Sequence, residues 1–530
     1  MKKKRRLPLF TDILFMLGIL GCRLEYVPTM VYTISYDPNG GSGTVPIDTT
    51  PYKQGDAATV LEPKRLIKET FVFAGWNTKP DGSGSSYLPG SLITVDAELI
   101  LYACWITPPD TRTFYAQRLT DGEWYELNAD LLAEGEHCMI YGDRKEGIPI
   151  PTAEAIIEEY ESVIYPAMTD TFGAIEDIDE NGKVIFLLLD IIDGYKGSGS
   201  YIMGYFQPAD MYRYGDYSNQ ADMLYLDIDP LGPGSREFYA SLAHELEHLI
   251  NFSNTAAKDG RSQDIWIDEG LATAAEYIYG GDPNHRIPYY NADPYHSIVY
   301  GNNFFVWNGY WEDPLSENVS YDPAANYATV YLFFQWLRIH SRIGTGIYKE
   351  IINSPYRDYR AVTEAAARWI DPCFAEWETL LRSGMLANVC NAAEGFWGYK
   401  GEIKTVCHYF QSTGGDLWQR FSPGEGIVSA FGESPFSPNN DSGPHIRYVG
   451  LSRTGELSET PPYTGDYLLT FNANSDAGAS GYEQGYLAGT GTAFLPRDSG
   501  IPDQFLPNRY PIDVRFNRDG SFSFSSSGAK

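Results

Sequence analysis

The sequence predicts a multidomain α+β protein, and three changes of pattern along the chain support this fold class. Residues 31–107 contain short alternating segments, residues 108–395 mix strand and helix patterns, and residues 396–530 are rich in Gly, Ser, Pro and aromatic residues. A chain of 530 residues is long enough for several domains that each bury a core. The 43% of hydrophobic and 21% of charged residues are typical of a globular chain.

The charge balance limits the classes of partner. The chain has 70 acidic and 39 basic side chains and a formal net charge of −31. Proteins that bind nucleic acids or anionic membrane surfaces need clustered Lys and Arg, because their partners carry phosphate. The composition therefore argues against a nucleic-acid-binding protein and against a polybasic membrane-surface protein.

Residues 1–21 are predicted to be an export signal. Residues 2–6 are all Lys or Arg, and the apolar stretch that follows is too short to span a membrane comfortably. Residues 19–22 read Ile-Leu-Gly-Cys and resemble the lipobox of bacterial lipoproteins, which implies a lipid on Cys22. Ordinary cleavage beside an incidental cysteine is the alternative. We therefore expect an exported protein, anchored in the membrane at the bacterial cell surface or in the periplasm, with residues 22–30 as a linker.

Five further cysteines would lie in a compartment that permits disulfides. Because five is odd, at most two intramolecular disulfides can form, and the sequence does not reveal the pairing. Reduced, buried cysteines are an equal alternative. No pair has the C-x-x-C spacing of a Cys-based zinc site or a redox motif. The five are Cys104, Cys138, Cys373, Cys390 and Cys407.

Residues 31–107 are predicted to form a small β module. Residues 32–36 and 99–102 alternate as strands do. The run of residues 73–84, followed by residues 101–105, resembles the internalin B-repeat. This resemblance implies a β-grasp-like module of a kind common on bacterial surface proteins, with a role as a spacer or in adhesion.

The first half of residues 108–395 is predicted to contain a helix over residues 152–168 and a buried strand over residues 184–189. Residues 177–182 read Asp-Ile-Asp-Glu-Asn-Gly, like the opening of a calcium loop. The twelfth position of such a loop should be a bidentate Glu, but here it is Leu188. A plain turn is therefore favoured, with Ca²⁺ binding as the alternative.

A predicted helix over residues 235–252 contains the most informative motif. His244 and His248 are four residues apart and share one helix face, so they can offer two imidazoles to one metal ion. Glu245 reaches over the same site, where it could act on a metal-bound water. His-Glu-x-x-His on a helix is the signature of zinc metalloproteases. Glu247 is expected to point away from this face into solvent.

Zinc needs a third protein ligand, which we expect from the next predicted helix. Glu269 is the best candidate, because the residues after His248 leave room for a helix exit, a loop and a helix entry. Asp268 and Glu276 are fallbacks. Asp268 could instead cap the helix, and Glu276 could lie on a solvated face.

The two motifs together resemble those of a known enzyme group. His-Glu-x-x-His followed by Trp-x-x-Glu-Gly-x-Ala looks like the glutamate-liganded zinc metallopeptidases, and residues 108–390 resemble the hyicolysin family. The resemblance implies a secreted zinc endopeptidase with one catalytic Zn²⁺ on His244, His248 and Glu269. Thr273 occupies a position at which some related enzymes have a carboxylate behind the first histidine. The residue that orients His244 therefore stays open.

A further predicted helix, over residues 326–337, is similar to the segment that supplies a tyrosine oxyanion donor in related aminopeptidases. Tyr327 fits that role best and Tyr331 second, with a packing role as the alternative. The remaining downstream histidines have no paired spacing, so we expect them to be structural. They are His285, His296, His340 and His408.

We therefore expect a lipid-anchored zinc metalloendopeptidase that hydrolyses peptide bonds in extracellular proteins. Zinc would activate a water, Glu245 would take its proton and pass it to the leaving amine, and Tyr327 would assist at the oxyanion. The alternative is a cell-surface adhesin with an inactive peptidase domain. An exopeptidase is a further alternative, because residues 173–177 superficially resemble the amine-binding motif of zinc aminopeptidases. Residues 396–530 are expected to be a β-rich accessory domain.

Overall fold

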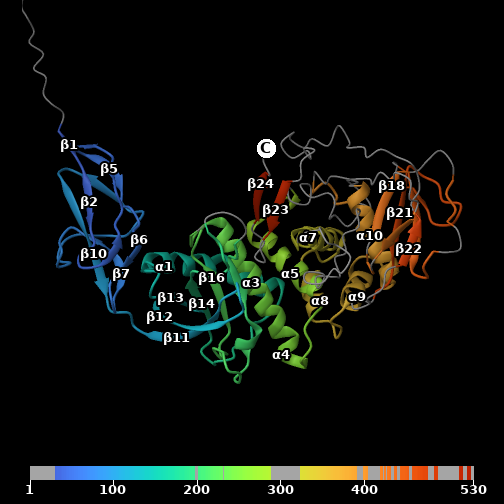
Figure 1. The fold of residues 1–530 in the computed structure, drawn as a ribbon, viewed down its shortest axis with the longest axis horizontal. Coiled ribbons are helices and arrows are strands. Elements are labelled where there is room, and N and C mark those ends of the chain that lie inside the picture. The colour runs from blue at the N-terminus through green and yellow to red at the C-terminus, as the bar shows by residue number, and fades with distance from the viewer. Residues whose placement is uncertain are drawn as a thin grey trace, which may run out of the picture.

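The chain has the expected multidomain α+β fold (Figure 1). The computed structural model describes residues 30–196, 201–230, 232–287, 323–390, 398–403, most of 418–475, and three short strands beyond. The predicted export signal and Cys22 lie outside the described residues. In Figure 1 the N-terminal β module, the central domain and the strands β18, β21 and β22 follow one another from left to right, whereas β23 and β24 lie in the middle of the view, above α3 and α5. The predicted boundaries at residues 107/108 and 395/396 remain predictions.

The β module is built around a four-stranded sheet with the order β2-β10-β7-β8, in which β2 and β10 are parallel. Its core surrounds Trp76, whose ring lies edge-on to Tyr36 and Phe73 at 4.7 and 5.0 Å. The strands are β1 (Val31–Tyr32), β2 (Ile34–Asp37), β3 (Ser42–Thr44), β4 (Tyr52–Lys53), β5 (Asp56–Thr59), β6 (Lys64–Ile67), β7 (Val72–Asn77), β8 (Ser86–Tyr87), β9 (Leu92–Val95) and β10 (Leu99–Ile106).

The β module packs against the central domain. Val72 is 7% exposed and belongs to the same buried cluster as Leu132 and Ile148 of that domain. Arg65 forms an ion pair with Glu146 across this contact, with Nε and Oε2 3.1 Å apart. The two parts therefore share apolar and charged contacts in addition to the connecting chain.

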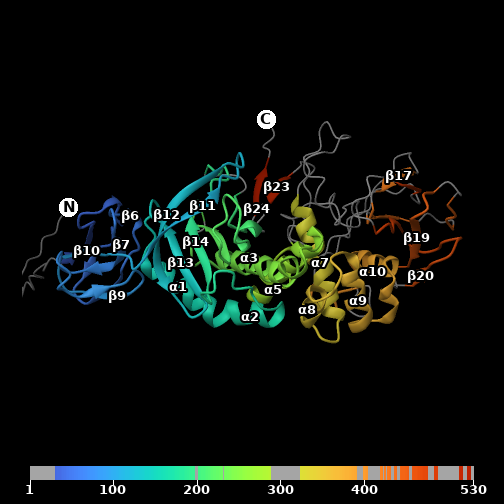
Figure 2. The same ribbon diagram turned by 90° about the horizontal axis from the view of Figure 1, so that it is seen from below.

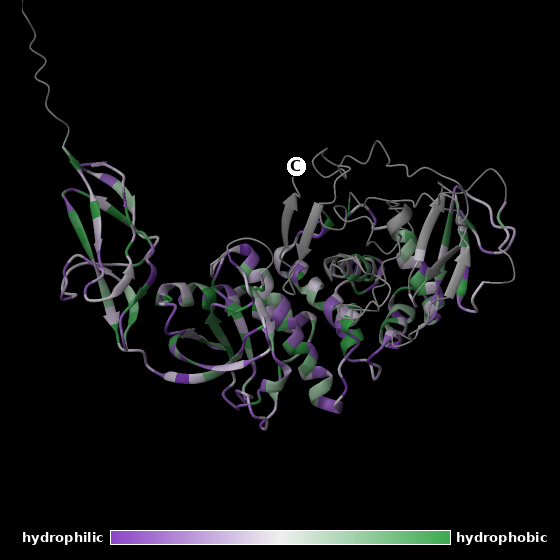
Figure 3. Cartoon of the chain, viewed as in Figure 1, coloured by the Kyte–Doolittle hydropathy of each residue, from purple (hydrophilic) through white to green (hydrophobic). Residues whose placement is uncertain are grey.

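The central domain contains a six-stranded mixed sheet with the order β11-β12-β13-β14-β16-β15. Strands β13, β14 and β16 are parallel, and β15 is an antiparallel edge strand. All residues of β14 are buried, which confirms the predicted strand over residues 184–189. Figure 3 shows the middle strands of this sheet in green, as hydrophobic. The strands are β11 (Thr111–Gln117), β12 (Trp124–Glu134), β13 (Cys138–Asp143), β14 (Val184–Leu189), β15 (Gly204–Phe206) and β16 (Met223–Asp227).

The predicted helix over residues 152–168 forms with an interruption. Helix α1 (Ile150–Glu159) continues through one π-helical turn (Tyr160–Ile164) into α2 (Tyr165–Thr171). The π turn precedes Pro166, which has no backbone N–H for the regular helical hydrogen bond. Side chains of α1, α2 and α3 join one buried cluster with alternate residues of β14, so these helices cover the same face of the sheet (Figure 2).

Helix α3 is the element predicted from the His-Glu-x-x-His motif, and it begins where expected. The Ser235 Oγ accepts a hydrogen bond from the Phe238 N–H at 3.1 Å, which caps the helix. Gly270 of α5 allows close packing on α7, because a Cβ there would collide with the Phe334 ring. The helices of this region are α3 (Arg236–Asn254), α4 (Ala256–Asp259), α5 (Ile265–Gly280), α7 (Pro323–His340), α8 (Gly346–Ile352), α9 (Tyr359–Trp369) and α10 (Trp377–Cys390), with 3-10 turns at Pro208–Met211 and Pro372–Ala375.

The C-terminal part is β-rich, as expected. A four-stranded antiparallel sheet has the order β18-β21-β19-β20, and β17 pairs with β22. The strands β23 and β24 pair with each other in antiparallel fashion. The bounds are β17 (Trp418–Phe421), β18 (Gly426–Ala430), β19 (Ile446–Leu451), β20 (Leu457–Ser458), β21 (Tyr467–Asn472), β22 (Glu483–Tyr486), β23 (Ile512–Phe516) and β24 (Phe522–Ser526).

The described residues bear on the state of the cysteines and on membrane-spanning helices. Cys104, Cys138 and Cys373 are free thiols. Within the part of the chain that the structure describes, no helix has both the length and the apolar character needed to cross a bilayer.

Candidate metal centre

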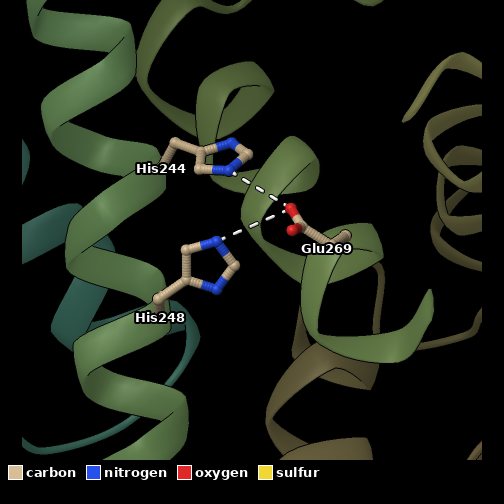
Figure 4. Close-up of side chains that lie close together, drawn as sticks. All are labelled: His244, His248 and Glu269. Carbon is tan, nitrogen blue, oxygen red and sulfur yellow. Dashed lines mark ion pairs between the residues drawn. The ribbon is translucent and has the colours of Figure 1, made fainter. Parts of the chain in front are cut away.

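Helices α3 and α5 bring together the three side chains that the sequence predicted as metal ligands. His244 and His248 project from one face of α3, and Glu269 projects from the first turns of α5 toward both rings (Figure 4). The Glu269 Oε2 lies 3.4 Å from the His244 Nε2 and 3.6 Å from the His248 Nε2. One donor atom from each residue falls within 4.8 Å of the other two.

The donor atoms of this site fit a divalent metal ion. The His244 Nε2 and the Glu269 Oε2 are buried and have no hydrogen-bond partner in the described structure. Burial by itself would raise the pKa of Glu269, but its contacts with His244 and His248 outweigh burial and lower the pKa to about 2. Glu269 is therefore ionised at neutral pH, as a metal ligand must be.

Glu245 lies beside the three donors and is held by the edge strand of the sheet. Its side chain is 3% exposed, and its Oε2 accepts a hydrogen bond from the Phe206 N–H of β15 at 3.0 Å. Burial raises the pKa of the Glu245 carboxyl. A carboxylate with a raised pKa is well suited to take up and release a proton near neutral pH.

Glu276, expected as a fallback ligand or as a solvated residue, instead lies behind His244 and orients its ring. Its Oε1 lies 2.8 Å from the His244 Nδ1, on the side of the ring opposite Glu269. The same carboxylate accepts hydrogen bonds from Arg286, at 2.9 Å from Nε, and contacts the His285 Nε2 at 2.9 Å. Glu276 follows Glu269 by two helical turns, so the helical period could have placed both on one face.

His248 has a carboxylate on its other ring nitrogen as well. The Asp268 Oδ1 lies 3.2 Å from the His248 Nδ1, so this fallback ligand contacts a histidine ring and lies away from the Glu269 side. Glu247 was expected in solvent, and this expectation is wrong, because its side chain is 0% exposed. The helix packs closely enough on its neighbours to bury nearly every side chain of its middle turns.

The two tyrosines of α7 have different surroundings. The Tyr327 hydroxyl donates a hydrogen bond to the Glu269 Oε1 at 3.2 Å, and its ring lies 6.2 Å from the His244 ring. The Tyr331 hydroxyl donates to the Pro283 carbonyl at 2.8 Å, and its ring packs on His285 at 4.8 Å. The geometry therefore brings Tyr327, the preferred candidate, to the ligand group.

A cleft opens beside the ligand group. Its walls combine aromatic and polar side chains, and the rings of Phe206 and Phe252 meet edge-on at 5.6 Å. The lining residues are Phe206, Pro208, His248, Asn251, Phe252, Thr255, Ser262, Gln263, Asp268 and Glu269.

The acidic turn at residues 177–182 and His340 lie outside the ligand group. Asp177, Asp179 and Asp222 gather with oxygen atoms within 4.8 Å of one another, and Asp177 also accepts hydrogen bonds from the backbone of its own turn. These contacts suit a plain turn as well as a calcium site, so Ca²⁺ stays a prediction. The His340 Nε2 is 2.7 Å from the Gly398 carbonyl, which agrees with a structural role. His296 and His408 lie outside the described residues.

Known proteins resemble separate parts of this chain. Residues 32–104 match the family described as the Listeria-Bacteroides repeat domain, so the repeat module expected there is present. A Gly-rich membrane protein of Evansella cellulosilytica, described as putative, is 36% identical over 76 residues. That stretch is 14% of this chain and 9% of the other.

A longer similarity covers more than half of the chain. The neutral metalloprotease ShpI of Staphylococcus hyicus is 32% identical over 303 residues, which are 55% of this chain and 66% of ShpI. This similarity supports a metallopeptidase family for the chain. A solved metallopeptidase from Bacteroides thetaiotaomicron covers 87% of this chain and is itself covered to 86%, at 10% identity. Its TM-score of 0.25 is too low to support a shared fold.

Proposed function

We propose that the protein is a zinc metalloendopeptidase that cleaves peptide bonds in extracellular proteins. The observation that carries the proposal is the convergence of His244, His248 and Glu269 on one point, with two donor atoms buried and unpartnered. Two imidazoles and one carboxylate are the donor set of catalytic zinc sites, which keep the fourth position open for water. The similarity to ShpI supports the same reaction class.

The chain's own residues can each be given a role. When bound, zinc would supply a Lewis acid that polarises a water molecule and the substrate carbonyl. Glu245 accepts the proton of that water at its carboxylate and donates it to the leaving amine. Glu276 holds the His244 ring from behind at its Nδ1, and the Asp268 carboxylate lies 3.2 Å from the His248 Nδ1. Tyr327 donates its hydroxyl proton to Glu269 in this structure and would turn it to the oxyanion during the reaction.

Two measurements on purified protein test this proposal. The wild-type protein should contain zinc and cleave denatured casein, and a zinc chelator should stop the cleavage. The E245Q variant should keep its zinc and lose about 100-fold or more of the cleavage rate, because the amide cannot accept the proton. Full casein cleavage by E245Q would contradict the role of Glu245. Blocking the N-terminus of a test peptide without loss of cleavage separates an endopeptidase from an aminopeptidase.

The second candidate function is a cell-surface adhesin with an inactive peptidase domain. The repeat module at residues 32–104 favours it, because relatives of that stretch include proteins described as membrane proteins. Zinc content without proteolysis of any denatured substrate would support the adhesin.

We further propose that the protein is exported and anchored through a lipid on Cys22. The proposal rests on the basic and apolar pattern of the first residues and on the sequence around Cys22. The C22S variant should appear in the soluble fraction of cells, whereas the wild-type protein should sediment with membranes. Equal sedimentation of both would contradict the lipid anchor.

A further inference from the structure

Glu247 is a buried carboxyl group that the proposed reaction does not use. Its side chain is 0% exposed, and neither Oε1 nor Oε2 has a hydrogen-bond partner in the described structure. An ionised carboxylate in such a place is costly unless a cation or several donors compensate it. The residue therefore indicates a missing partner on this side of helix α3.

Two further donor groups face the Glu247 carboxylate. The His248 Nδ1 is buried and makes no hydrogen bond of good geometry, although the Asp268 Oδ1 lies 3.2 Å away. One donor atom each from Glu247, His248 and Asp268 falls within 4.8 Å of the other two. This group shares His248 with the first ligand group but uses its Nδ1, whereas the opposite nitrogen, Nε2, faces Glu269.

The charge around the two groups favours a second cation. Five carboxyl groups surround the two ligand groups, and one guanidinium is the only Arg or Lys side chain that the described structure places among them. The carboxylates belong to Glu245, Glu247, Asp268, Glu269 and Glu276, and the guanidinium belongs to Arg286. Asp268 lines the cleft and its side chain is 37% exposed, so an ion can enter from solvent and keep a water ligand.

We propose that Glu247, Asp268 and the Nδ1 of His248 form a second binding site for a divalent transition-metal ion of the zinc class. An imidazole nitrogen with two carboxylates matches the ligand preference of such an ion. To hold such an ion, the His248 Nδ1 would give up its proton to solvent. The inference rests on the proposed function, because the first ion occupies the Nε2 side of the same ring.

Zinc stoichiometry tests the second site on the full chain. Metal-stripped protein is dialysed to equilibrium against buffers of increasing free Zn²⁺, and zinc per chain is measured by atomic absorption. Wild-type protein should reach two equivalents, and E247Q should lose one of them while keeping the other. D268N should show the same loss. The matched control is D222N, a buried carboxylate of the other acidic cluster, which should keep two equivalents.

The outcomes separate this inference from the proposed function. Saturation of the wild-type protein at one equivalent overturns the second site and identifies a proton as the partner of Glu247. Retention of two equivalents by E247Q, or loss of one by D222N, also overturns it. The proposed function fails by a different result, namely unchanged casein cleavage by E245Q or no proteolysis by zinc-loaded wild-type protein. If E247Q does not fold, the wild-type stoichiometry and D268N still decide.

Discussion

The His244 Nδ1 lies 2.8 Å from the Glu276 Oε1, and this contact gives the first histidine of the motif a fixed orientation. Glu276 is 7% exposed and lies between His244, His285 and Arg286. Because the carboxylate occupies Nδ1, the Nε2 lone pair is directed toward Glu269 and the ligand site. Glu276, two helical turns after Glu269, thus supplies the carboxylate behind His244 that Thr273 lacks.

Replacing Glu276 should weaken metal binding. We expect E276Q to lower zinc affinity by about 10–100-fold, because the carboxylate behind a ligating histidine orients the ring and increases its basicity. E276D, which keeps the charge, should lose less. Competition with a chromogenic zinc chelator measures the affinity. The exposed Glu237 on the same helix α3 provides the control E237Q, and equal zinc affinity of E276Q and E237Q would refute this role.

The two tyrosines of α7 should differ in their effect on catalysis. Y327F should reduce kcat on the order of 100-fold with zinc content retained, because the lost hydroxyl lies at the ligand group. Y331F should change kcat little, because its hydroxyl bonds the Pro283 carbonyl. Steady-state kinetics on a quenched peptide with parallel zinc assays checks both. A Y327F enzyme with wild-type kcat would leave Tyr327 with a packing role only.

The β module should stabilise the central domain through its packed contact. We expect V72D to lower the free energy of unfolding by about 2 kcal/mol or more, because it places a charge in the cluster with Leu132 and Ile148. The matched control is I47D in the same module, where Ile47 is 80% exposed and a change within about 0.5 kcal/mol is expected. Urea unfolding followed by tryptophan fluorescence measures both. An unchanged midpoint for V72D would show that the two parts are only tethered.

Asp227, at the end of β16, should make stability depend on pH. Burial raises its pKa to about 8, with Asp190 and Asp193 adding to the shift and the Asp229 N–H opposing it. The folded protein keeps this proton at pH values at which the unfolded chain, with a pKa of 3.8, has lost it. Its contribution to stability is therefore complete below a pH of about 4 and is lost as the pH rises toward about 8.

The D227N variant isolates this contribution. The amide oxygen can still accept the Asp229 N–H, which bonds Asp227 at 3.0 Å, but it carries no charge. We expect a higher melting temperature than wild type at neutral pH and a flatter dependence between pH values of about 4 and 8. Thermal unfolding across this range is the measurement, with the exposed D229N as the control. A wild-type pH profile for D227N would show that Asp227 does not titrate there.

Much of the fold and the centre of the site could be predicted from local sequence. The period of 3.6 residues places His244 and His248 on one face of any helix that forms there, and Ser235 marks where that helix begins. The apolar run at residues 184–189 required a buried strand because its side chains are apolar on both faces. The π turn before Pro166 was not anticipated, because it depends on how α1 and α2 pack on the sheet.

Local sequence was enough to predict which residue types lie near the metal centre, because helical spacing is a property of the backbone. The pairing of each carboxylate with a nitrogen depends on the tertiary structure. Glu269, Asp268, Glu276 and Glu247 are close in sequence and chemically alike, yet they have four different surroundings. The angle and distance between α3 and α5 assign those surroundings. This angle and this distance arise from long-range packing, such as that of Gly270 against Phe334, which no local pattern encodes.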